Sequence, residues 1–176
     1  MKRKALLVSL LLILTFAIQA KVSLEPNISI YVGPTFTQKP EDIMRSSFSV
    51  KAELDPFCIN INEKHFISFP ISYTYVSKTP TYMYYNLNSH MDFGSGIGYR
   101  YRFNDIFSLG GDLGFALRYV PEVNGGLMSM DLTAEPWFHI NDYLAIMTPI
   151  RLGFTKSEFN LSAAIGLSYI PFGGRK

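Results

Sequence analysis

Apolar and polar residues alternate with a period of two along most of the chain from Asn27 onward. In the stretch 90–103, for example, Phe93 and Ile97 belong to a series of apolar residues at every second position. Glycines and charged residues such as Arg100 fill the positions between them. Because successive side chains of a strand point to opposite faces, this pattern predicts β-strands with one apolar and one polar face.

Eight segments follow this pattern, and most of them are 12–16 residues long. Strands of ordinary globular proteins average about 5–6 residues, whereas a tilted strand that crosses a bilayer needs roughly 9–11. Long amphipathic strands in an even number are typical of a transmembrane β-barrel. The predicted fold is therefore all-β, an eight-stranded antiparallel up-and-down transmembrane barrel. The predicted strands are 28–37, 46–61, 65–78, 89–103, 106–119, 126–140, 143–155 and 159–170.

Four prolines predict irregularities in these strands. In the second segment the apolar phase changes after Leu54, which predicts a β-bulge near Pro56. Pro70, Pro136 and Pro149 argue against regular strand at their own positions, because proline cannot donate a hydrogen bond to a neighbouring strand.

Three connections share one motif, in which an apolar residue is followed by Asn, an acidic residue and soon another apolar residue. They lie at 61–66, 103–107 and 140–144. Asn and Asp suit tight hairpins, because they tolerate left-handed backbone and bond to their own main chain. Outer-membrane barrels have short periplasmic turns and longer outer loops, so this end and both termini are expected on the periplasmic side. The looser connections are 38–45, 79–88, 120–125 and 156–158.

Aromatic residues gather near both ends of the predicted strands, where they are expected to form girdles at the two membrane interfaces. The turn-side girdle is predicted to contain Phe66, Phe103, Phe107, Phe138 and Tyr143. The loop-side girdle is predicted to contain Tyr82, Tyr84, Tyr85, Tyr119, Phe154 and Phe159.

The first twenty residues have the order of an export signal. Three basic residues precede an apolar run from position 5 to 18, which is short for a bilayer-spanning helix of roughly 17–25 residues. We predict a cleaved signal peptide at 1–20 and a barrel domain at 21–176. Lys21 follows the expected cleavage point where a lipoprotein would have Cys, so a lipid anchor is not expected.

Composition excludes several classes of function. Beyond the predicted signal peptide, 13 basic and 14 acidic residues give a net charge of −1, so a nucleic-acid partner is not expected. Hydrophobic residues make up 48% of the chain, which argues against disorder. Cys58 has no second cysteine to pair with and is read as a small apolar strand residue. No zinc spacing, P-loop or dinucleotide motif occurs, so neither a metal nor a cofactor is predicted.

Segments such as 96–103 and 166–172, together with the strand pattern and the export signal, carry a resemblance to a known group. The chain resembles the small outer-membrane β-barrel proteins of bacteria, the group of OmpX, the OmpA barrel domain, OmpW and the opacity-type proteins. Many of these end in an aromatic residue that the barrel-insertion machinery recognises; here Phe172 fits that place, with residues 173–176 after it.

This resemblance implies the outer membrane of a diderm bacterium as the location. The implied partners are outer-membrane lipid, lipopolysaccharide or its equivalent, and the insertion machinery. The roles known in the group include structural anchoring, adhesion and passage of small, often apolar molecules. A particular host or surface ligand is not implied.

If the apolar face meets lipid, the polar face lines the lumen. An eight-stranded barrel is wide enough only for side chains or one small ligand. The lumen is then either a salt-bridged polar plug or a narrow conduit, for which inward glycines such as Gly94, Gly96 and Gly98 would leave space. The predicted lumen-lining residues are Lys51, Glu53, Asp55, Asp92, Arg100, Arg102, Asp112, Arg118, Asp131, Glu135 and Arg151.

A soluble periplasmic barrel of lipocalin type is an alternative, with the apolar face around a ligand and the charges outside. A period of two does not by itself separate inside from outside. The polar face is poor in Lys for a solvent-exposed surface, and aromatics lie at the strand ends. Both observations favour the membrane barrel.

An outer-membrane lipid-modifying enzyme is a second alternative, because barrel-borne lipid A deacylases and acyltransferases show that this architecture carries catalysis. Such chemistry needs a nucleophile, a base and an orienting group. The chain has three histidines, His65, His90 and His139, and the run 89–92 combines Ser, His and Asp. Neighbouring residues rarely give triad geometry and no catalytic motif is present, so the protein is predicted not to be an enzyme.

Overall fold

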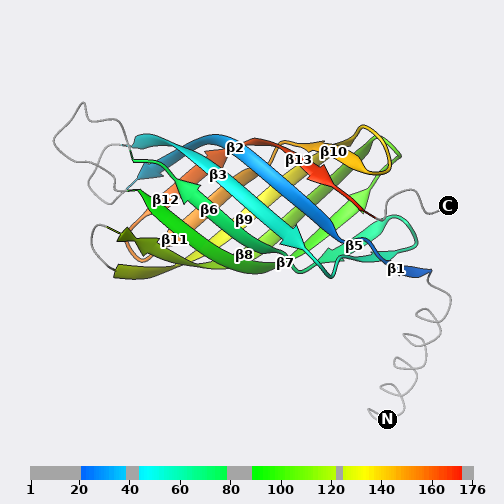
Figure 1. Cartoon of the computed structure of the whole chain (residues 1–176), viewed down its shortest axis with the longest axis horizontal. Helices are drawn as coiled ribbons and strands as arrows, with labels where there is room; N and C mark the ends of the chain where they lie inside the picture. Colours follow the sequence, from blue (N-terminus) through cyan, green and yellow to red (C-terminus); the bar gives the residue numbers. More distant parts are fainter. Residues whose placement is uncertain (1–20, 39–43, 79–88, 122–124, 172–176) are drawn as a thin grey trace, which may run out of the picture.

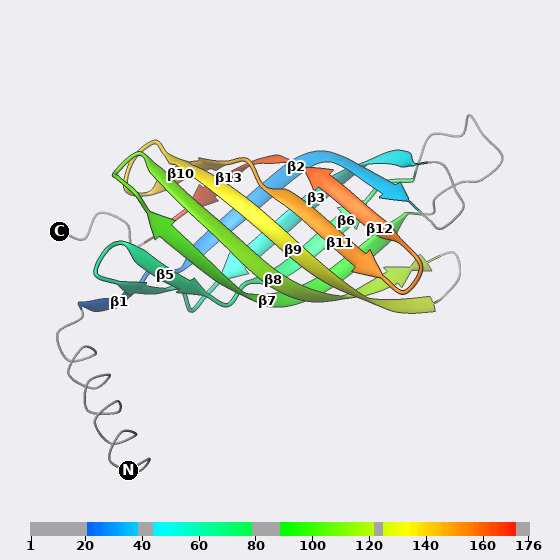
Figure 2. The same ribbon diagram turned by 180° about the vertical axis from the view of Figure 1, so that it is seen from behind.

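In a computed structural model, the structure describes residues 21–38, 44–78, 89–121 and 125–171. These residues form one antiparallel sheet that closes into a barrel (Figures 1 and 2). The strand segments are β1 (Val22–Leu24), β2 (Asn27–Gln38), β3 (Arg45–Asp55), β4 (Ile59–Ile61), β5 (His65–Ser68), β6 (Ile71–Val76), β7 (His90–Arg102), β8 (Phe107–Val120), β9 (Gly125–His139), β10 (Leu144–Met147), β11 (Ile150–Thr155), β12 (Phe159–Ala163) and β13 (Ile165–Tyr169). The described residues include no helix with the length and apolar character to cross a membrane.

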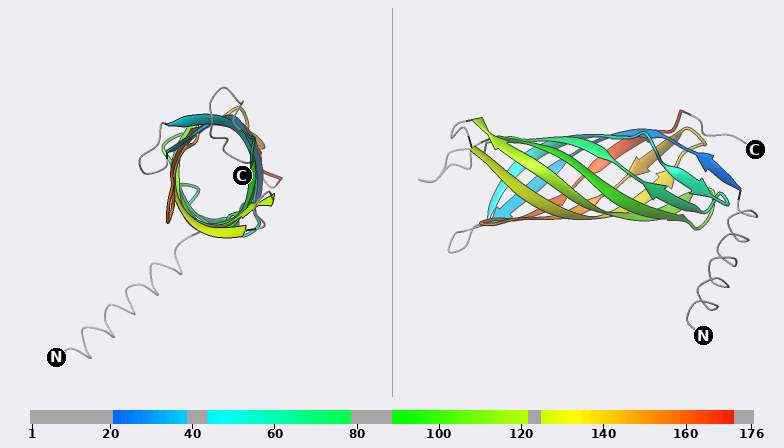
Figure 3. Two further views of the ribbon diagram at one scale, coloured as in Figure 1. Left: turned by 90° about the vertical axis from the view of Figure 1, so that its left-hand side faces the viewer. Right: turned by 90° about the horizontal axis from the view of Figure 1, so that it is seen from below.

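The thirteen segments make eight barrel strands, because several strands are interrupted once. The composite strands are β1 with β2, β3 with β4, β5 with β6, β10 with β11 and β12 with β13, whereas β7, β8 and β9 are continuous. β2 pairs with β3 on one edge and with β12 and β13 on the other, which closes the cylinder seen end-on in Figure 3. The predicted eight-stranded antiparallel barrel is therefore confirmed.

The second barrel strand contains the bulge predicted near Pro56. Leu54 pairs with Ile71, so an unbroken ladder would place Ile59 opposite Phe66. Ile59 lies opposite Ile67 instead, which shows one extra residue between β3 and β4. The extra residue reverses the phase of the strand, as the pattern of apolar residues indicated.

Proline explains the interruption between β10 and β11. The N–H of Thr148 donates to the carbonyl of Pro136 at 3.1 Å, so the ring nitrogen of Pro136 faces the same edge and returns no bond. Pro70 and Pro149 lie between strand segments, as expected. Pro136 lies inside the continuous strand β9, so the irregularity predicted at that position is wrong. The interruption falls instead in the neighbouring strand, between β10 and β11, which lacks the hydrogen bond that an N–H at position 136 would have donated.

The three predicted hairpin turns are built by the expected residues. Asn104 and Asn141 each accept two backbone N–H groups of their own turn on the side-chain oxygen, at 2.8 to 2.9 Å. At the remaining turn, Asn62 and Glu63 adopt left-handed backbone with φ of 55° and 61°. The predicted loops at 38–45, 79–88 and 120–125 lie largely outside the described residues, and so does the predicted signal peptide.

The barrel is apolar outside and polar inside. Large apolar side chains such as Ile97 and Phe115 are each 52% exposed on the outer face. Polar side chains such as Ser29, Thr37 and Asp92 are almost fully buried inside. A lipocalin-type barrel would have its apolar face inside, so the soluble alternative is wrong.

A row of aromatic rings covers the outer face at the turn end. Ring centroids are 4.9 Å apart for Tyr101 and Phe103, 5.6 Å for Phe103 and Phe107, and 5.4 Å for Phe107 and Phe138. At the other end, the exposed Tyr119 and the contact of Phe154 with Phe159 at 5.4 Å belong to the predicted loop-side girdle. Tyr82, Tyr84 and Tyr85 lie outside the described residues.

Phe66 does not belong to the turn-side girdle, so that assignment is wrong. Its side chain is 1% exposed and lies opposite Arg100, on the inner face. The neighbouring Ile67 carries the outward phase of β5. Position near a strand end suggested a girdle residue, but the alternation of faces decides the direction of the side chain.

Candidate functional site: the barrel interior

The eleven residues that the polar face predicts for the lumen are all buried or partly buried in the described barrel. They come from β3, β7, β8, β9 and β11, and their positions alternate with the exposed apolar residues of the same strands. Seven of them are buried, namely Glu53, Asp55, Asp92, Arg100, Arg118, Asp131 and Glu135. The other four, Lys51, Arg102, Asp112 and Arg151, are partly buried. The ion pairs below occur at two separate levels of the barrel.

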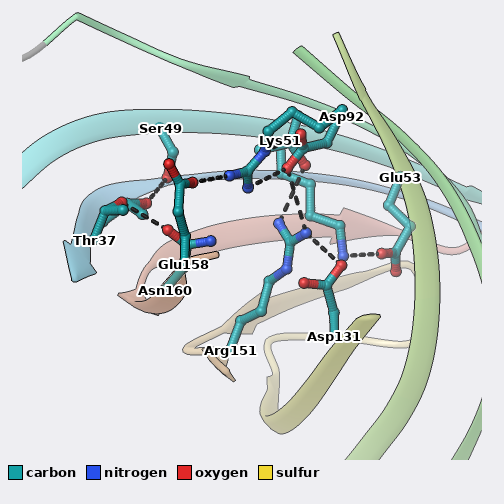
Figure 4. A network of polar contacts seen from close by, with 12 residues as sticks. Thr37, Ser49, Lys51, Glu53, Asp92, Asp131, Arg151, Glu158 and Asn160 are labelled. Carbon is teal, nitrogen blue, oxygen red and sulfur yellow. Dashed lines mark hydrogen bonds and ion pairs between the residues drawn. The ribbon is translucent and has the colours of Figure 1, made fainter. Parts of the chain in front are cut away.

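An ion-pair network lies near the loop end of the interior (Figure 4). Arg118 donates from Nε and Nη2 to the two carboxylate oxygens of Asp92, at 2.9 and 3.2 Å. Its third nitrogen, Nη1, donates to Glu158 at 2.8 Å. The side chains of Arg118 and Asp92 are only 5% and 3% exposed, so the bidentate pair is removed from water.

Arg151 extends this network across the barrel. Its guanidinium pairs with Asp131, lies 3.8 Å from Asp92 and donates to the hydroxyl of Thr74 at 3.4 Å. The loop-side network, as we call it, consists of Asp92, Arg118, Asp131, Arg151 and Glu158. It connects four barrel strands and the β11–β12 turn, and each of its arginines meets two carboxylates.

A different arrangement occupies the turn end. The guanidinium of Arg100 lies between two aromatic rings, 4.2 Å from the centroid of Phe66 and 4.0 Å from that of Trp137. Arg102 lies 4.9 Å from the same Phe66 ring. Both arginines share one carboxylate, with Nη2 atoms 3.3 and 3.4 Å from Oε1 of Glu25. These five residues are the turn-side cluster.

Side chains fill most of the space between the two levels. Four of the voids in the described part of the interior have volumes of 20, 20, 10 and 30 Å³. A buried water needs roughly 10–15 Å³ of such volume, so each void admits one to a few waters at most. The interior of the described barrel is therefore plugged by polar side chains.

Two of the inward glycines, Gly96 and Gly98, leave no open space in the lumen. A Cβ on Gly98 would lie 2.3 Å from the Ser68 hydroxyl, and one on Gly96 would lie 2.7 Å from the Leu113 carbonyl. Neighbouring atoms already occupy the space that these residues leave. Glycine at these two positions permits close approach of the strands instead.

Two carboxylates of the interior lie outside the predicted set. Glu25 binds both turn-side arginines, and Glu158 binds Arg118. The first predicted strand begins at 28 and the last at 159, so both residues lie outside the predicted strands. Glu25 shares the inward phase of Asn27 and Ser29, and Glu158 shares that of Asn160. Extending each alternation by one or two pairs would have found them.

Two of the three histidines, His65 and His139, contact hydroxyl groups in the described residues. The hydroxyl of Ser108 lies 2.8 Å from Nε2 of His139, but Ser108 is fully buried. His65 contacts the hydroxyl of Tyr99 at 2.7 Å at the turn end, and both oxygens of Asp92 bind Arg118. Among the described residues, no group of three or more His, Cys, Asp or Glu side chains is placed to hold a metal ion.

A closed strand ladder, an apolar outer face and a polar interior together define a transmembrane β-barrel of the outer-membrane type. In a bilayer every backbone polar group must be paired, and closure of the sheet satisfies this requirement. The aromatic girdle at the turn end fits the position where such a barrel meets the membrane interface.

Comparison with solved structures gives the same class. The chain is similar to Ail, the attachment invasion locus protein of Yersinia pestis, with a TM-score of 0.56 and 15% identity over 84% of this chain and 98% of that chain. It is also similar to Neisserial surface protein A, NspA, with a TM-score of 0.57 and 11% identity over 85% and 99%. Both likenesses show the fold of small outer-membrane barrels. No family model matches the chain, and no curated protein matches its sequence.

Proposed function

We propose that the protein is an integral outer-membrane barrel with a structural, surface-exposed role, and that its lumen does not pass solutes. The observation that carries this proposal is the filled interior of the described barrel, in which buried arginines bind carboxylates and four voids have volumes of 10 to 30 Å³. A charge that lost its partner in such an interior would cost several kcal/mol, so the ion pairs hold the barrel closed.

The arrangement of the strand ends supports a role at the cell surface. The strands β2, β6 and β8, which the looser connections follow, end at the side of the barrel opposite the tight turns (Figure 1). Longer loops of outer-membrane barrels face outward. Ail is named for attachment and invasion, and NspA is named as a surface protein. In this proposal the rigid barrel presents its outer loops, while outer-membrane lipid, including lipopolysaccharide or its equivalent, surrounds its apolar face.

We also propose that the protein is not an enzyme and that the barrel-insertion machinery assembles it. The Ser108 hydroxyl contacts His139, and burial keeps it from a substrate. Export and a C-terminal aromatic segment fit assembly by insertion machinery. Labelling with an active-site serine reagent should leave the folded protein unmodified.

The test is membrane fractionation followed by planar-bilayer recording of the purified, folded protein. We expect the protein in the outer-membrane fraction, a shift in gel mobility between unheated and boiled samples, and no conductance above that of the bare bilayer. Recovery from the soluble periplasmic fraction would overturn the membrane assignment. Stable conductance steps would overturn the closed lumen and favour passage of small solutes.

A further inference from the structure

A groove with a volume of 570 Å³ lies on the outer, lipid-facing surface of the barrel wall. It runs over three neighbouring strands, β2, β13 and β10, which lie side by side in Figure 1. At its centre, Leu167 of β13 lies opposite Ile30 of β2 on one side and Ile146 of β10 on the other. Small-molecule sites have volumes of roughly 300–1,000 Å³, so the groove has the size of a ligand site.

The groove offers almost only hydrocarbon to a ligand. Ile30 and Leu167 are 55% and 57% exposed, and five of the lining residues are Ile or Val. β13 pairs with β2 on one edge and with β10 on the other, so its backbone groups at 166–169 already have partners. Ser168, the one lining residue with a hydroxyl group besides Tyr169, is fully buried. A ligand therefore gains packing contacts and no hydrogen bonds along most of the groove.

The shape of the groove is fixed before a ligand binds. Ile and Val side chains are stiff at χ1, because two heavy atoms on Cβ restrict the rotamers. Behind the groove, the same part of the wall has a packed inner cluster of Tyr31, Trp137, Ala145, Met147 and Ile170. An unfilled groove would forfeit dispersion contacts along its walls, whereas a flexible unbranched chain can follow it and make contacts on both sides.

The turn end of the groove is its polar end. Tyr169 is 49% exposed and lies opposite Leu144, the first residue of β10 after the turn that contains Asn141. Tyrosine suits a membrane interface, because its ring is apolar and its hydroxyl is polar. An acyl chain in the groove would therefore have its polar end beside Tyr169 and its methyl end toward Ile165, which lies opposite Val32.

We propose that this groove binds one acyl chain of a phospholipid, from the leaflet at the turn end, as an ordered ligand. The groove is continuous with the outer face that already contacts membrane lipid. A second barrel is the less suitable occupant, because protein contacts within a membrane rely on small or polar residues. The exposed side chains at the centre of the groove are branched and aliphatic. Binding there depends on the outer face alone and is independent of whether the lumen conducts.

Photolabelling of the unmodified protein tests the site without a mutation. The probe is a phosphatidylcholine with a diazirine in the middle of one acyl chain, diluted into the phospholipid vesicles that hold the folded barrel. Peptides containing 28–32 or 165–169 should be labelled at least about tenfold more than the peptide around Leu132, a preference of about 1.4 kcal/mol. Leu132 is 46% exposed on the same outer face and lies outside the groove. Equal or lower labelling of the groove peptides would show ordinary exchanging lipid and overturn the proposal.

Native mass spectrometry of two matched variants gives a second measurement. Leu167→Trp fills the centre of the groove, whereas Leu132→Trp places the same ring between Leu113 and Leu152 of the neighbouring strands. With dioleoyl phosphatidylethanolamine as the probe, the unmodified barrel and Leu132→Trp should each retain one lipid, and Leu167→Trp should retain at least about tenfold less. Equal retention by the two variants, or none by the unmodified barrel, would overturn the proposal. A barrel dimer that Leu167→Trp dissociates would assign the groove to a second copy and overturn it as well.

Discussion

The two ends of the barrel interior hold buried arginines in different ways. At the loop end, Arg118 is surrounded by charge, with Asp92 and Glu158 at 2.8 to 3.2 Å. At the turn end, Arg100 is enclosed by the rings of Phe66 and Trp137 and has one longer contact with a shared carboxylate, at 3.3 Å. Opposite charge therefore dominates one end, and planar stacking contributes strongly at the other.

This difference has energetic consequences. Removing one partner of a buried ion pair leaves an uncompensated charge and costs about 3–5 kcal/mol. A desolvated cation–π contact contributes about 2 kcal/mol, and the planar guanidinium of arginine suits a space between two rings better than a lysine ammonium does. The loop-side network should accordingly lose more stability when a charge is removed. The turn-side cluster should be more sensitive to loss of the planar guanidinium group.

The largest effect is expected for Arg118→Met. The substitution leaves Asp92 without its bidentate partner and Glu158 without its arginine, so the free energy of unfolding should fall by about 3–5 kcal/mol. Urea unfolding of the barrel in phospholipid vesicles measures the change. Lys156→Met, on the exposed turn beside Glu158, is the matched control and should alter stability little. A loss below 1 kcal/mol for Arg118→Met would mean that the loop-side network does not stabilise the barrel.

Arg100→Met should cost less, about 1–2 kcal/mol, because the thioether still packs between the rings and Glu25 keeps Arg102. Arg100→Lys preserves the charge but removes the planar group. If stacking is important, both variants should lose stability and shift the fluorescence of Trp137, the one tryptophan of the chain. A lysine variant with the stability and emission of the unmodified protein would show that charge alone holds this end.

Glu158→Gln should have a smaller effect, about 1 kcal/mol, because Arg118 keeps both bonds to Asp92 and the amide oxygen still accepts a hydrogen bond. The same vesicle assay applies. Combined with Arg118→Met, the substitution should be far from additive, since both remove one contact. Additive losses would indicate that the Glu158 contact does not act through Arg118.

The smallest effect is expected at the exposed pair of Lys21 and Glu63 in the first turn. The hydrogen bond and charge of Lys21 lower the pKa of Glu63 below its usual 4.5. Such a depressed pKa gives a stabilising contribution above pH 4.5 that is lost as the pH falls through the lowered value. Above pH 4.5, Glu63→Gln should therefore lower the free energy of unfolding only marginally. High salt should remove this difference, because it screens an exposed ion pair. A large loss of stability for Glu63→Gln at neutral pH would contradict a weak, solvent-exposed ion pair at this turn.

The alternation of residues was sufficient to predict the barrel strands, the residues that share a face of each strand, and the bulge near Pro56. These features depend on neighbours in the chain, because period two and turn chemistry are local properties. The same local view misassigned Phe66, whose place near a strand end suggested the girdle. It also placed an irregularity at Pro136, where the missing hydrogen bond interrupts the opposite strand instead.

The contacts between interior side chains could not be predicted from the sequence. Arg100 and Trp137 are 37 positions apart, and Arg118 and Glu158 are 40 apart. Which inward side chains meet depends on the stagger of strands around the closed barrel. Glu25 and Glu158 entered the interior only because the strand phase continues beyond the segments that the pattern delimits.

The amino-acid sequence by itself determined that long strands alternate between an apolar and a polar face, since backbone geometry sends successive side chains to opposite sides. Only the tertiary structure decided that the polar face is inside, that side chains fill the lumen, and that ring stacking and ion pairing stabilise opposite ends. Closure of the sheet brings distant residues together in three dimensions, and a one-dimensional period does not encode which of them meet.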